Sequence, residues 1–481
     1  MGSHTWDLVV IGGGTAGIVT STTAARLGAR VALVESERTG GDCLWTGCVP
    51  SKALIAAAAT ASSARRAPEK GIDVQGVDVD FARVMAGVRA SIAAIAPVDS
   101  PQTLSRKGVR VISGRAAFAD ASTLLVDGAA MPFRRAVLCT GASPSVPDVP
   151  GLRAAASTLT SDSVWDLDEL PDRLLVMGGG SIGCELGQAF ARLGARVTVV
   201  EAADRLLPQE DPEASALVEA SLRRDDVTVL TATSVLRVEE PDGQATVVHV
   251  DDGAGGTTTI DVDAVLVAVG RRARTDDLGL AAAGIDVADS GAVVVDQQLR
   301  TTNPRVWAAG DVTALPAFTH VAGVHGTIAA TNALLGLRRK VDLSAVPRVT
   351  FTDPEVAAVG VTGPGSGKSP RTRSVRVGHA DVDRAVVDGR TEGFSRLLLD
   401  RRRRIVGATL VGPRAGESLA EVTLAIRRGA GVGVLTSTMH PYPTYGDGVW
   451  NAAIGDSRER LDHPLVRGAI RLLLALRRGA G

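Results

Sequence analysis

The chain has 481 residues, of which 45% are hydrophobic and 22% are charged, and its formal net charge is −1. This length predicts about three domains, and the composition excludes a disordered or fibrous chain. The charge leaves no basic surplus for binding nucleic acid. Four cysteines are too few for a secreted disulfide framework, and we find no secretory signal and no uncharged apolar stretch of about 18 residues. We therefore expect a cytoplasmic protein without a membrane span or a nucleic-acid partner.

A glycine-rich turn follows the first apolar run of the chain, residues 7–11. A helix-favouring stretch comes next, and then a second apolar run that ends in Glu35. The order strand, glycine turn, helix, strand, acid is typical of a dinucleotide site, in which the acid accepts a hydrogen bond from a ribose hydroxyl. The turn needs glycine for its tightness, for the approach of a pyrophosphate and for close helix–strand packing, and the three residues are, in that order, Gly12, Gly14 and Gly17.

The same pattern occurs a second time further along the chain. An apolar run at 174–177 leads into a second glycine turn, a helical stretch and another apolar run that ends in Glu201. Each acid follows the last glycine of its turn by the same 18 positions. Two copies with one internal spacing predict two dinucleotide sites, one for a flavin and one for a nicotinamide. The glycines of the second turn are Gly178, Gly180 and Gly183.

Two of the four cysteines, Cys43 and Cys48, follow the first acid closely, with Lys52 beside them. Positions five apart in a regular helix point to different sides, so a bridge between the two requires a distorted turn, which Gly47 and Pro50 can supply. A bridge across so short a loop adds little stability, and zinc would need two further ligands. The pair is therefore interpreted as a redox-cycling dithiol, and no metal site is expected.

With these motifs, the sequence resembles the FAD-dependent pyridine nucleotide–disulfide oxidoreductases, the group that holds dihydrolipoamide dehydrogenase and mercuric reductase. The resemblance covers nearly the whole chain. Beyond the cysteine segment it rests on four motifs in the family's order, Cys139-Thr140-Gly141-Ala142, Val269-Gly270-Arg271-Arg272, Ala309-Gly310-Asp311 with Thr319-His320-Val321-Ala322, and Phe351-Thr352-Asp353-Pro354-Glu355.

The resemblance implies an α/β fold with two Rossmann-like domains, for FAD and NAD(P), and a C-terminal α+β dimerisation domain. The implied boundaries are 1–152 for the first part of the FAD domain, 153–272 for the NAD(P) domain, 273–342 for the return to the FAD domain and 343–481 for the interface domain. The two remaining cysteines, Cys139 and Cys184, are interpreted as small buried residues.

The resemblance also implies roles for individual residues. Cys48 would lie against the flavin as the charge-transfer thiol and Cys43 would face the substrate, while Lys52 and Glu185 would form an ion pair beside the flavin ring. Asp311 would hold the ribityl chain of the flavin. The full set of implied cofactor-binding residues is Gly12, Gly14, Gly17, Glu35, Gly41, Lys52, Thr140, Gly141, Asp311, Ala322, Gly178, Gly180, Gly183, Glu201, Gly270 and Arg271.

The C-terminal segment departs from the family pattern. Tyr442 stands where disulfide reductases carry a catalytic histidine, and Asp447 stands where they carry a glutamate. In the family this segment reaches across the two-fold interface of a homodimer into the partner's site. Tyrosine titrates near about 10 and is a poor proton shuttle at neutral pH. His440, two residues upstream, either supplies that function or is an ordinary polar histidine.

We therefore expect a homodimeric enzyme that moves electrons from NAD(P)H through FAD to the Cys43–Cys48 disulfide and on to a small-molecule disulfide. Glu201 favours NADH, because a carboxylate repels a 2′-phosphate, although Arg205 leaves NADPH possible. The alternatives are direct transfer from the flavin to quinones, oxygen or Hg(II), and a non-catalytic FAD-binding subunit. A tyrosine near position 442 is a feature in which the sequence resembles mercuric reductases. Those enzymes carry further cysteines near the C-terminus, and the lack of any cysteine after Cys184 weakens the case for Hg(II) as substrate.

Two further segments carry expectations. Leucines and arginines at helical spacing predict an amphipathic helix over Leu465–Arg478, which we expect to dock on its own protein or on the partner subunit rather than on a membrane. The segment Gly363–Thr372, rich in glycine, serine and proline, is predicted to be a surface loop.

Overall fold

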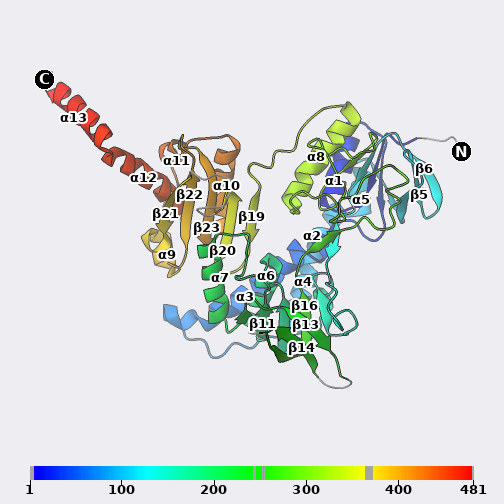
Figure 1. Cartoon of the computed structure of the whole chain (residues 1–481), viewed down its shortest axis with the longest axis horizontal. Helices are drawn as coiled ribbons and strands as arrows, with labels where there is room; N and C mark the ends of the chain where they lie inside the picture. Colours follow the sequence, from blue (N-terminus) through cyan, green and yellow to red (C-terminus); the bar gives the residue numbers. More distant parts are fainter. Residues whose placement is uncertain (1–4, 242–244, 252, 254, 363–371, 479–481) are drawn as a thin grey trace. The chain divides into compact units, whose positions relative to one another are not determined.

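The computed structural model describes residues 5–241, 245–251, 253, 255–362 and 372–478, so all but the last residue of the loop predicted at 363–372 lie outside the described residues. The chain forms two compact units (Figure 1). The first unit comprises residues 1–202 and 226–342, and the second comprises 203–225 and 343–481. Residues 203–225, which the sequence analysis assigns to the NAD(P) domain, thus belong to the second unit by their contacts.

The first glycine turn lies at the edge of a five-stranded parallel sheet in the order β18-β7-β1-β2-β3. Every residue of β1 is buried, as expected for a central parallel strand that is covered on both faces. Helices α1 and α8 pack against each other beside this sheet (Figure 1). The parallel pairing of β18 with β7 brings residues from beyond position 300 back into the first sheet. The bounds are β1 Leu8–Ile11, α1 Thr15–Arg26, β2 Val31–Glu35, β3 Val109–Ser113, β7 Ala136–Leu138, β18 Val306–Ala308 and α8 Thr319–Leu335.

The second glycine turn lies in an equivalent place in a second five-stranded parallel sheet, in the order β12-β11-β10-β16-β9. The turn connects the central strand β10 to α6, as the first turn connects β1 to α1. The chain therefore repeats one βαβ unit twice, in agreement with the repeated sequence pattern. The bounds are β9 Thr158–Thr160, β10 Arg173–Met177, α6 Ser181–Leu193, β11 Arg196–Val200, β12 Thr228–Leu230 and β16 Ala264–Val267.

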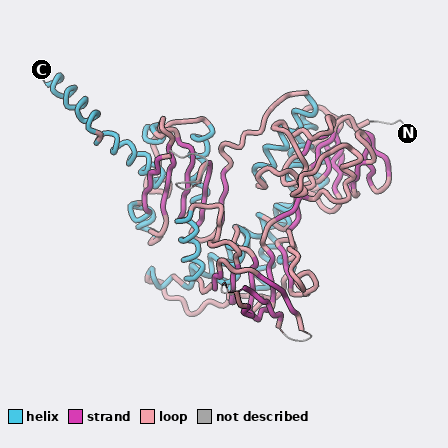
Figure 2. The backbone as a smooth tube through the Cα atoms, in the orientation of Figure 1, coloured by secondary structure: helices cyan, strands magenta, loops and turns pink. Residues whose placement is uncertain are grey.

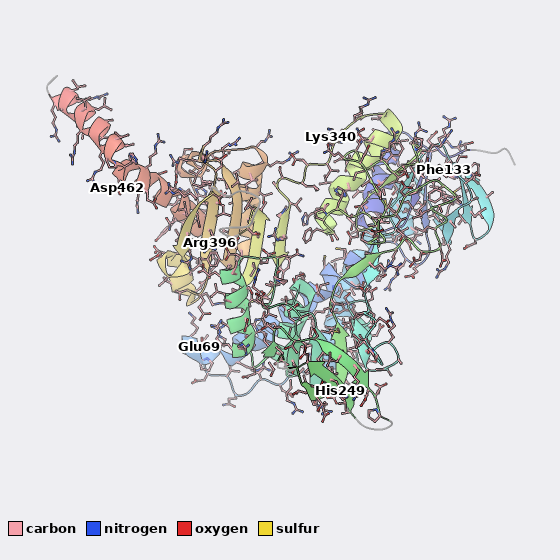
Figure 3. The ribbon with its side chains drawn as sticks, viewed as in Figure 1. Glu69, Phe133, His249, Lys340, Arg396 and Asp462 are labelled. Atoms are coloured by element: carbon pink, nitrogen blue, oxygen red, sulfur yellow. The ribbon has the colours of Figure 1, made fainter. Side chains whose placement is uncertain are left out.

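Short helices and small sheets complete the first unit, and the strands are drawn in magenta in Figure 2. Phe133, labelled in Figure 3, is buried in the core between the first sheet and a three-stranded sheet, β4-β5-β6. The bounds are α2 Gly41–Trp45, α3 Cys48–Arg65, η1 Ala67–Lys70, α4 Phe81–Ile95, η2 Ala96–Asp99, α5 Pro101–Arg106, β4 Ala116–Phe118, β5 Thr123–Val126, β6 Ala129–Pro132, β8 Ala142–Pro144, η3 Val164–Asp166, β13 Val235–Glu239, β14 Thr246–Asp251, β15 Thr257–Val262 and β17 Arg271–Ala273.

One helical stretch in the described part of the chain, Phe81–Arg106, is long and apolar enough by length and composition to cross a membrane. It comprises α4, η2 and α5. The α4 residues Phe81, Met85, Val88 and Ile92 recur at helical spacing and are buried, and α4 packs against α3.

The second unit is built on a five-stranded antiparallel sheet in the order β19-β20-β23-β22-β21. Helix α10 packs on β20 and β23, and α12 packs on β21 and β22. Arg396 of β22, labelled in Figure 3, forms ion pairs with Asp211 and Glu213 at the start of α7, which ties residues 203–225 to this unit. The bounds are α7 Pro212–Arg224, β19 Pro347–Thr350, β20 Glu355–Gly360, β21 Arg373–Gly378, η4 His379–Asp381, α9 Asp383–Asp388, β22 Phe394–Leu399, β23 Ile405–Gly412, α10 Ala415–Arg427, α11 Gly433–Ser437, α12 Asp447–Asp462 and α13 Pro464–Arg478.

The predicted amphipathic helix forms as α13, but it does not dock on its own chain. None of its residues is buried, and in Figure 1 it continues from α12 away from the sheet of the second unit. The expectation of docking on its own protein is therefore wrong for the single chain. Helical periodicity predicts the helix itself, but it cannot say which surface its apolar face meets.

Candidate functional site

The two redox cysteines lie on two consecutive helices, α2 and α3. Cys43 is in α2, Cys48 is the first residue of α3, and the break between them is at Thr46 and Gly47. The indole of Trp165 donates a hydrogen bond to the carbonyl oxygen of Thr46 at 2.8 Å and so holds the break. Pro50 lies in the first turn of α3, where no intrahelical N–H bond is lost. The distortion that the spacing requires therefore comes from Gly47 and not from Pro50.

The environment of the two sulfurs separates their pKa values. A hydrogen bond from Cys43 is the main cause that lowers the pKa of Cys48 to about 6. The hydroxyl of Thr319, 3.5 Å from the sulfur of Cys48, and the charge of Lys52 act in the same direction. The same hydrogen bond to Cys48, together with burial, raises the pKa of Cys43. The reduced pair thus carries one proton, on Cys43, and a thiolate at Cys48.

Lys52 and Glu185 form an ion pair, with 2.8 Å between the ammonium nitrogen and a carboxylate oxygen. Lys52 lies one helical turn after Cys48 in α3, and Glu185 lies in α6, which packs against α3. The side chain of Glu185 is 7% exposed, so its charge would be costly without the lysine. The glutamate raises the pKa of Cys48 while the lysine lowers it, and the pair therefore sets the thiolate's electrostatic environment.

The two glycine turns have the same close packing of helix on strand. A Cβ atom at Gly17 would lie 1.8 Å from the carbonyl oxygen of Gly12, and one at Gly183 would lie 1.9 Å from that of Gly178. No side chain fits at either position. Space is open on the outer side of the second turn, where a Cβ at Gly180 would meet nothing within 4 Å, while a Cβ at Gly14 in the first turn would meet only the Cα of Gly41 at 3.7 Å. This side leaves the helix N-terminus accessible to a phosphate.

The two acids that end the second strands brace these turns. A carboxylate oxygen of Glu35 accepts a hydrogen bond from the amide of Gly13 at 2.5 Å. In the second copy a carboxylate oxygen of Glu201 accepts one from the amide of Gly179 at 2.6 Å. Each acid is therefore fixed beside its turn, where a ribose would lie.

A cavity of about 930 Å³ opens at the first glycine turn. Asp311 lies in it, and burial raises the pKa of this carboxyl. Asp162, also in the lining, has one buried carboxylate oxygen without a hydrogen-bond partner among the described residues. The volume and the glycine cradle suit a dinucleotide, so the residues present fit FAD. The predicted FAD residues that line the cavity are Gly12, Gly14, Glu35, Gly41, Thr140, Gly141, Asp311 and Ala322.

Arg271 contacts residues close to Cys43. It pairs with Asp42, the residue before Cys43, and donates to the carbonyl oxygen of Ala142. Arg274 also pairs with Asp42, at 3.3 Å. Gly270, which precedes Arg271, accepts a hydrogen bond from the amide of Ser145. Sequence reasoning missed Asp42 and Arg274 as neighbours of the site, because residues some 230 positions apart in the chain have no local spacing that links them.

His440 does not present a free nitrogen for catalysis in this structure. One ring nitrogen lies 2.9 Å from a carboxylate oxygen of Glu421, and the other lies 2.9 Å from the carbonyl oxygen of Thr438. The ring also packs beside that of Trp450, and the side chain is 8% exposed. This histidine therefore anchors the C-terminal loop to α10.

Both tyrosines of the chain donate hydrogen bonds to the aspartates that begin and end α9. The hydroxyl of Tyr442 donates to Asp383 at 2.5 Å, which raises the pKa of this exposed tyrosine. Tyr445 is buried and donates to Asp388 at 2.9 Å, and burial followed by this bond raises its pKa to about 12. Asp447, also buried, accepts a hydrogen bond from the amide of Thr444. Tyr442 therefore offers the C-terminal loop's one exposed phenol among the described residues.

Comparison with known proteins agrees with this geometry. The family described as "Pyridine nucleotide-disulphide oxidoreductase" matches residues 6–326, and the dimerisation domain of the same family matches residues 346–453. A mercuric reductase of Streptomyces lividans is 37% identical over 462 residues, which cover 94% of this chain and 96% of the relative. A dihydrolipoyl dehydrogenase of Geobacillus stearothermophilus is 36% identical over 453 residues, which cover 93% of this chain and 95% of the relative.

The solved structures give the same result for the fold. The Cu(II) complex of the HOCl-induced flavoprotein disulfide reductase RclA from Escherichia coli superposes with a TM-score of 0.84 at 28% identity, covering 94% of this chain and 99% of that one. The predictions of fold class, of FAD and NAD(P)H as cofactors, and of an oxidoreductase are confirmed. The chain belongs to the pyridine nucleotide–disulfide oxidoreductase family, and it is an FAD-dependent NAD(P)H:disulfide oxidoreductase by fold and by relationship.

Proposed function

We propose that this enzyme is a cytoplasmic homodimer that uses NADH to reduce small-molecule disulfides. The observation that carries the proposal is the placement of the two sulfurs, with Cys48 one helical turn before Lys52 and 3.5 Å from the hydroxyl of Thr319, and Cys43 across the helix break. When bound, FAD supplies the chemistry of accepting a hydride from the nicotinamide and passing two electrons to the Cys43–Cys48 disulfide. The overall reaction takes NADH, one proton and one disulfide to NAD⁺ and two thiols.

The two sulfurs divide the work of breaking the substrate disulfide. Cys43 loses its proton to solvent, and its thiolate attacks one substrate sulfur, forms a mixed disulfide and expels the first thiol as a thiolate that gains a proton from solvent. The Cys48 thiolate then attacks the sulfur of Cys43, forms the Cys43–Cys48 disulfide and releases the second thiol as a thiolate that gains a proton from solvent. The substrate gains the two electrons that the cysteine pair loses, so the exchange is balanced.

The C-terminal loop supports a narrower class of substrate. Its phenol, Tyr442, is bonded to Asp383 and is a poor acid at neutral pH, and His440 is engaged on both ring nitrogens. Without a good acid, the leaving thiol must be stable as an anion. We therefore propose disulfides of acidic thiols, such as aromatic thiols, as the best substrates, because a leaving thiol of lower pKa departs faster.

A series of disulfides with thiols of graded pKa, assayed at fixed NADH, tests this substrate class. Turnover by the wild type should fall steeply as the thiol pKa rises, and Tyr442→His should flatten the dependence by supplying an acid. Equal turnover of aromatic and aliphatic disulfides by the wild type would reject the class.

The homodimer is supported by the match to the dimerisation domain, and light scattering should give twice the chain mass of 49.4 kDa.

The preference for NADH rests on Glu201. Its carboxylate is fixed beside the second turn by the amide of Gly179, where it favours a 2′-hydroxyl over a 2′-phosphate. Steady-state kinetics with both nucleotides should give at least about tenfold higher kcat/KM for NADH, equivalent to ~1.4 kcal/mol. A comparable preference for NADPH would overturn this assignment.

Hg(II) is a second candidate substrate, and two observations favour it. A thiophilic ion needs no acid for a leaving group, which suits Tyr442, and mercuric reductases are among the relatives at 37% identity. NADH oxidation that depends on Hg(II) and releases elemental mercury would support this substrate. If there is no such activity, Hg(II) is rejected and a disulfide remains the proposed substrate. The non-catalytic subunit considered from the sequence is not retained, because the relatives and the fold neighbours are enzymes.

A further inference from the structure

The C-terminal helix α13 has a composition unlike the rest of the chain. It spans Pro464–Arg478 and carries four arginines, Arg467, Arg471, Arg477 and Arg478. No aspartate or glutamate occurs after Asp462, whereas the whole chain has nearly equal numbers of acidic and basic residues. The helix lies beyond residues 346–453, which match the dimerisation domain. Its chemistry is therefore not accounted for by the family's interface.

The helix separates apolar from basic side chains. At about 100° per residue, three arginines project within one narrow sector, and most of the leucines project on the opposite side. Arg477 lies in the last turn, where a long side chain can extend past the helix end. The arginines of the sector are Arg467, Arg471 and Arg478, and the residues of the apolar face are Leu465, Val466, Ala469, Ile470, Leu472, Leu473 and Leu476.

This apolar face is uncovered in the chain. Leu465 is 79% exposed, Leu472 and Leu473 are each 62% exposed, and Leu476 is 63% exposed. In Figure 3 the helix begins beyond Asp462, the labelled last residue of α12, and its side chains stand out around it. A contiguous run of exposed leucines on one helix face marks an interaction surface.

Charge decides between the possible occupants. Two copies of α13 packed through their leucines would leave the arginines of both helices on the outer sides, with no acid on either helix to pair with them. An anionic phospholipid surface complements both faces at once, since its acyl region takes the leucines and its headgroups take the arginines. We propose that α13 lies in the headgroup layer of an anionic membrane and docks this enzyme peripherally on the bilayer.

This mode of binding is distinct from a membrane span. A helix of 15 residues is about 22 Å long, shorter than the roughly 30 Å hydrocarbon core, and its arginine sector favours an orientation in the plane of the surface. If the enzyme is the proposed homodimer, two helices per particle add avidity. The docking itself rests only on α13 and is independent of the substrate.

Co-sedimentation of the full-length holoenzyme with vesicles tests the proposal. Phosphatidylcholine vesicles with roughly 30% phosphatidylglycerol should retain the enzyme, and pure phosphatidylcholine vesicles should retain about tenfold less. Raising the salt from about 50 mM to about 500 mM should weaken the retention, because the arginine contribution is screened. Leu472→Glu with Leu476→Glu, and separately Arg467→Gln with Arg471→Gln, should each reduce binding to anionic vesicles at least about tenfold.

The matched control is Ile72→Glu, which places the same charge at another exposed apolar residue, 60% exposed, outside α13. It should bind vesicles like the wild type. All variants should keep the same NADH turnover in the absence of lipid, which shows that they are folded. The proposal is overturned if the wild type does not sediment with anionic vesicles, or if the double leucine variant binds as well as the wild type. It is also overturned if the leucine variant changes only the particle mass, which would identify a second copy of the chain as the occupant.

Discussion

Cys43 in α2 and Cys48 at the start of α3 lie on either side of the break at Thr46 and Gly47, and the hydroxyl of Thr319 lies 3.5 Å from the sulfur of Cys48. The interaction between the two thiols is the main cause that shifts their pKa values in opposite directions. A helix that ran unbroken through the pair would place the two side chains on different sides. The break in the helix is therefore the structural origin of the thiolate.

Removing each of the two charges near Cys48 should shift the pKa of this thiol in opposite directions. Lys52 lowers the pKa of Cys48 and Glu185 raises it, so Lys52→Met should raise this pKa and Glu185→Gln should lower it. The pH dependence of the long-wavelength thiolate–flavin absorbance in the reduced enzyme measures the pKa. Shifts of the same sign in both variants would contradict the assignment of the pair.

The close packing at the two glycine turns predicts that FAD binding and reduction by NADH can be lost separately. Gly17→Ala should give protein that does not retain FAD, because the new Cβ would collide with the carbonyl of Gly12. Gly183→Ala should give yellow protein that dithionite reduces but that NADH reduces at least about tenfold more slowly. Gly87→Ala is the control, since a Cβ there meets nothing and alanine favours the helix by about 1 kcal/mol. Identical spectra and reduction rates for both turn variants would reject two separate sites.

Tyr442 and Tyr445 are the chain's two tyrosines, so their titration can be followed directly by ultraviolet absorbance. Asp383→Asn should lower the pKa of Tyr442, because the carboxylate that now disfavours the phenolate would become neutral. Asp388→Asn should lower the pKa of Tyr445 from about 12 in the same way. An Asp383→Asn titration curve identical to that of the wild type would show that the bond between Tyr442 and Asp383 does not form in solution.

Two buried histidines predict acid sensitivity. Burial lowers the pKa of both His325 and His379 to about 4, compared with about 6.5 in the unfolded chain. The unfolded state binds more protons between these values, so the stability that each neutral ring contributes is complete above about pH 6.5 and is lost as the pH falls toward 4. Each loss is on the order of 3 kcal/mol. Calorimetry from pH 7 to pH 5 should show a falling Tm, and His325→Gln or His379→Gln should reduce the slope; an unchanged slope in both variants would refute this origin.

Local patterns predict much of the nucleotide-binding fold. The glycine turns and their acids could be placed from spacing alone, because each turn joins a strand and a helix that are adjacent in sequence. The amphipathic helix at the C-terminus was equally visible from its periodicity. The return of residues from beyond position 300 to pair with β7 depended on the family resemblance, since strand order is a long-range property.

The contacts that tune the site could not be predicted from the sequence. Asp42 and Arg271 are separated by 229 positions, and Tyr442 and Asp383 by 59, so no local periodicity connects them. Thr319 stood in a motif that the sequence made visible, yet its contact with Cys48 depends on how α8 packs in the first unit. The anchoring of His440 by Glu421 likewise requires the packed position of α10.

The most direct test of the central claim is a reductive titration of the wild type and of Cys43→Ser and Cys48→Ser. The wild type should take up about four electrons, two in FAD and two in the cysteine pair, while each variant should take up about two. Cys43→Ser should keep a long-wavelength thiolate band that Cys48→Ser lacks, and neither should turn over a disulfide. A wild type that takes up only two electrons, or a Cys43→Ser variant with undiminished disulfide turnover, would contradict electron transfer through these two sulfurs.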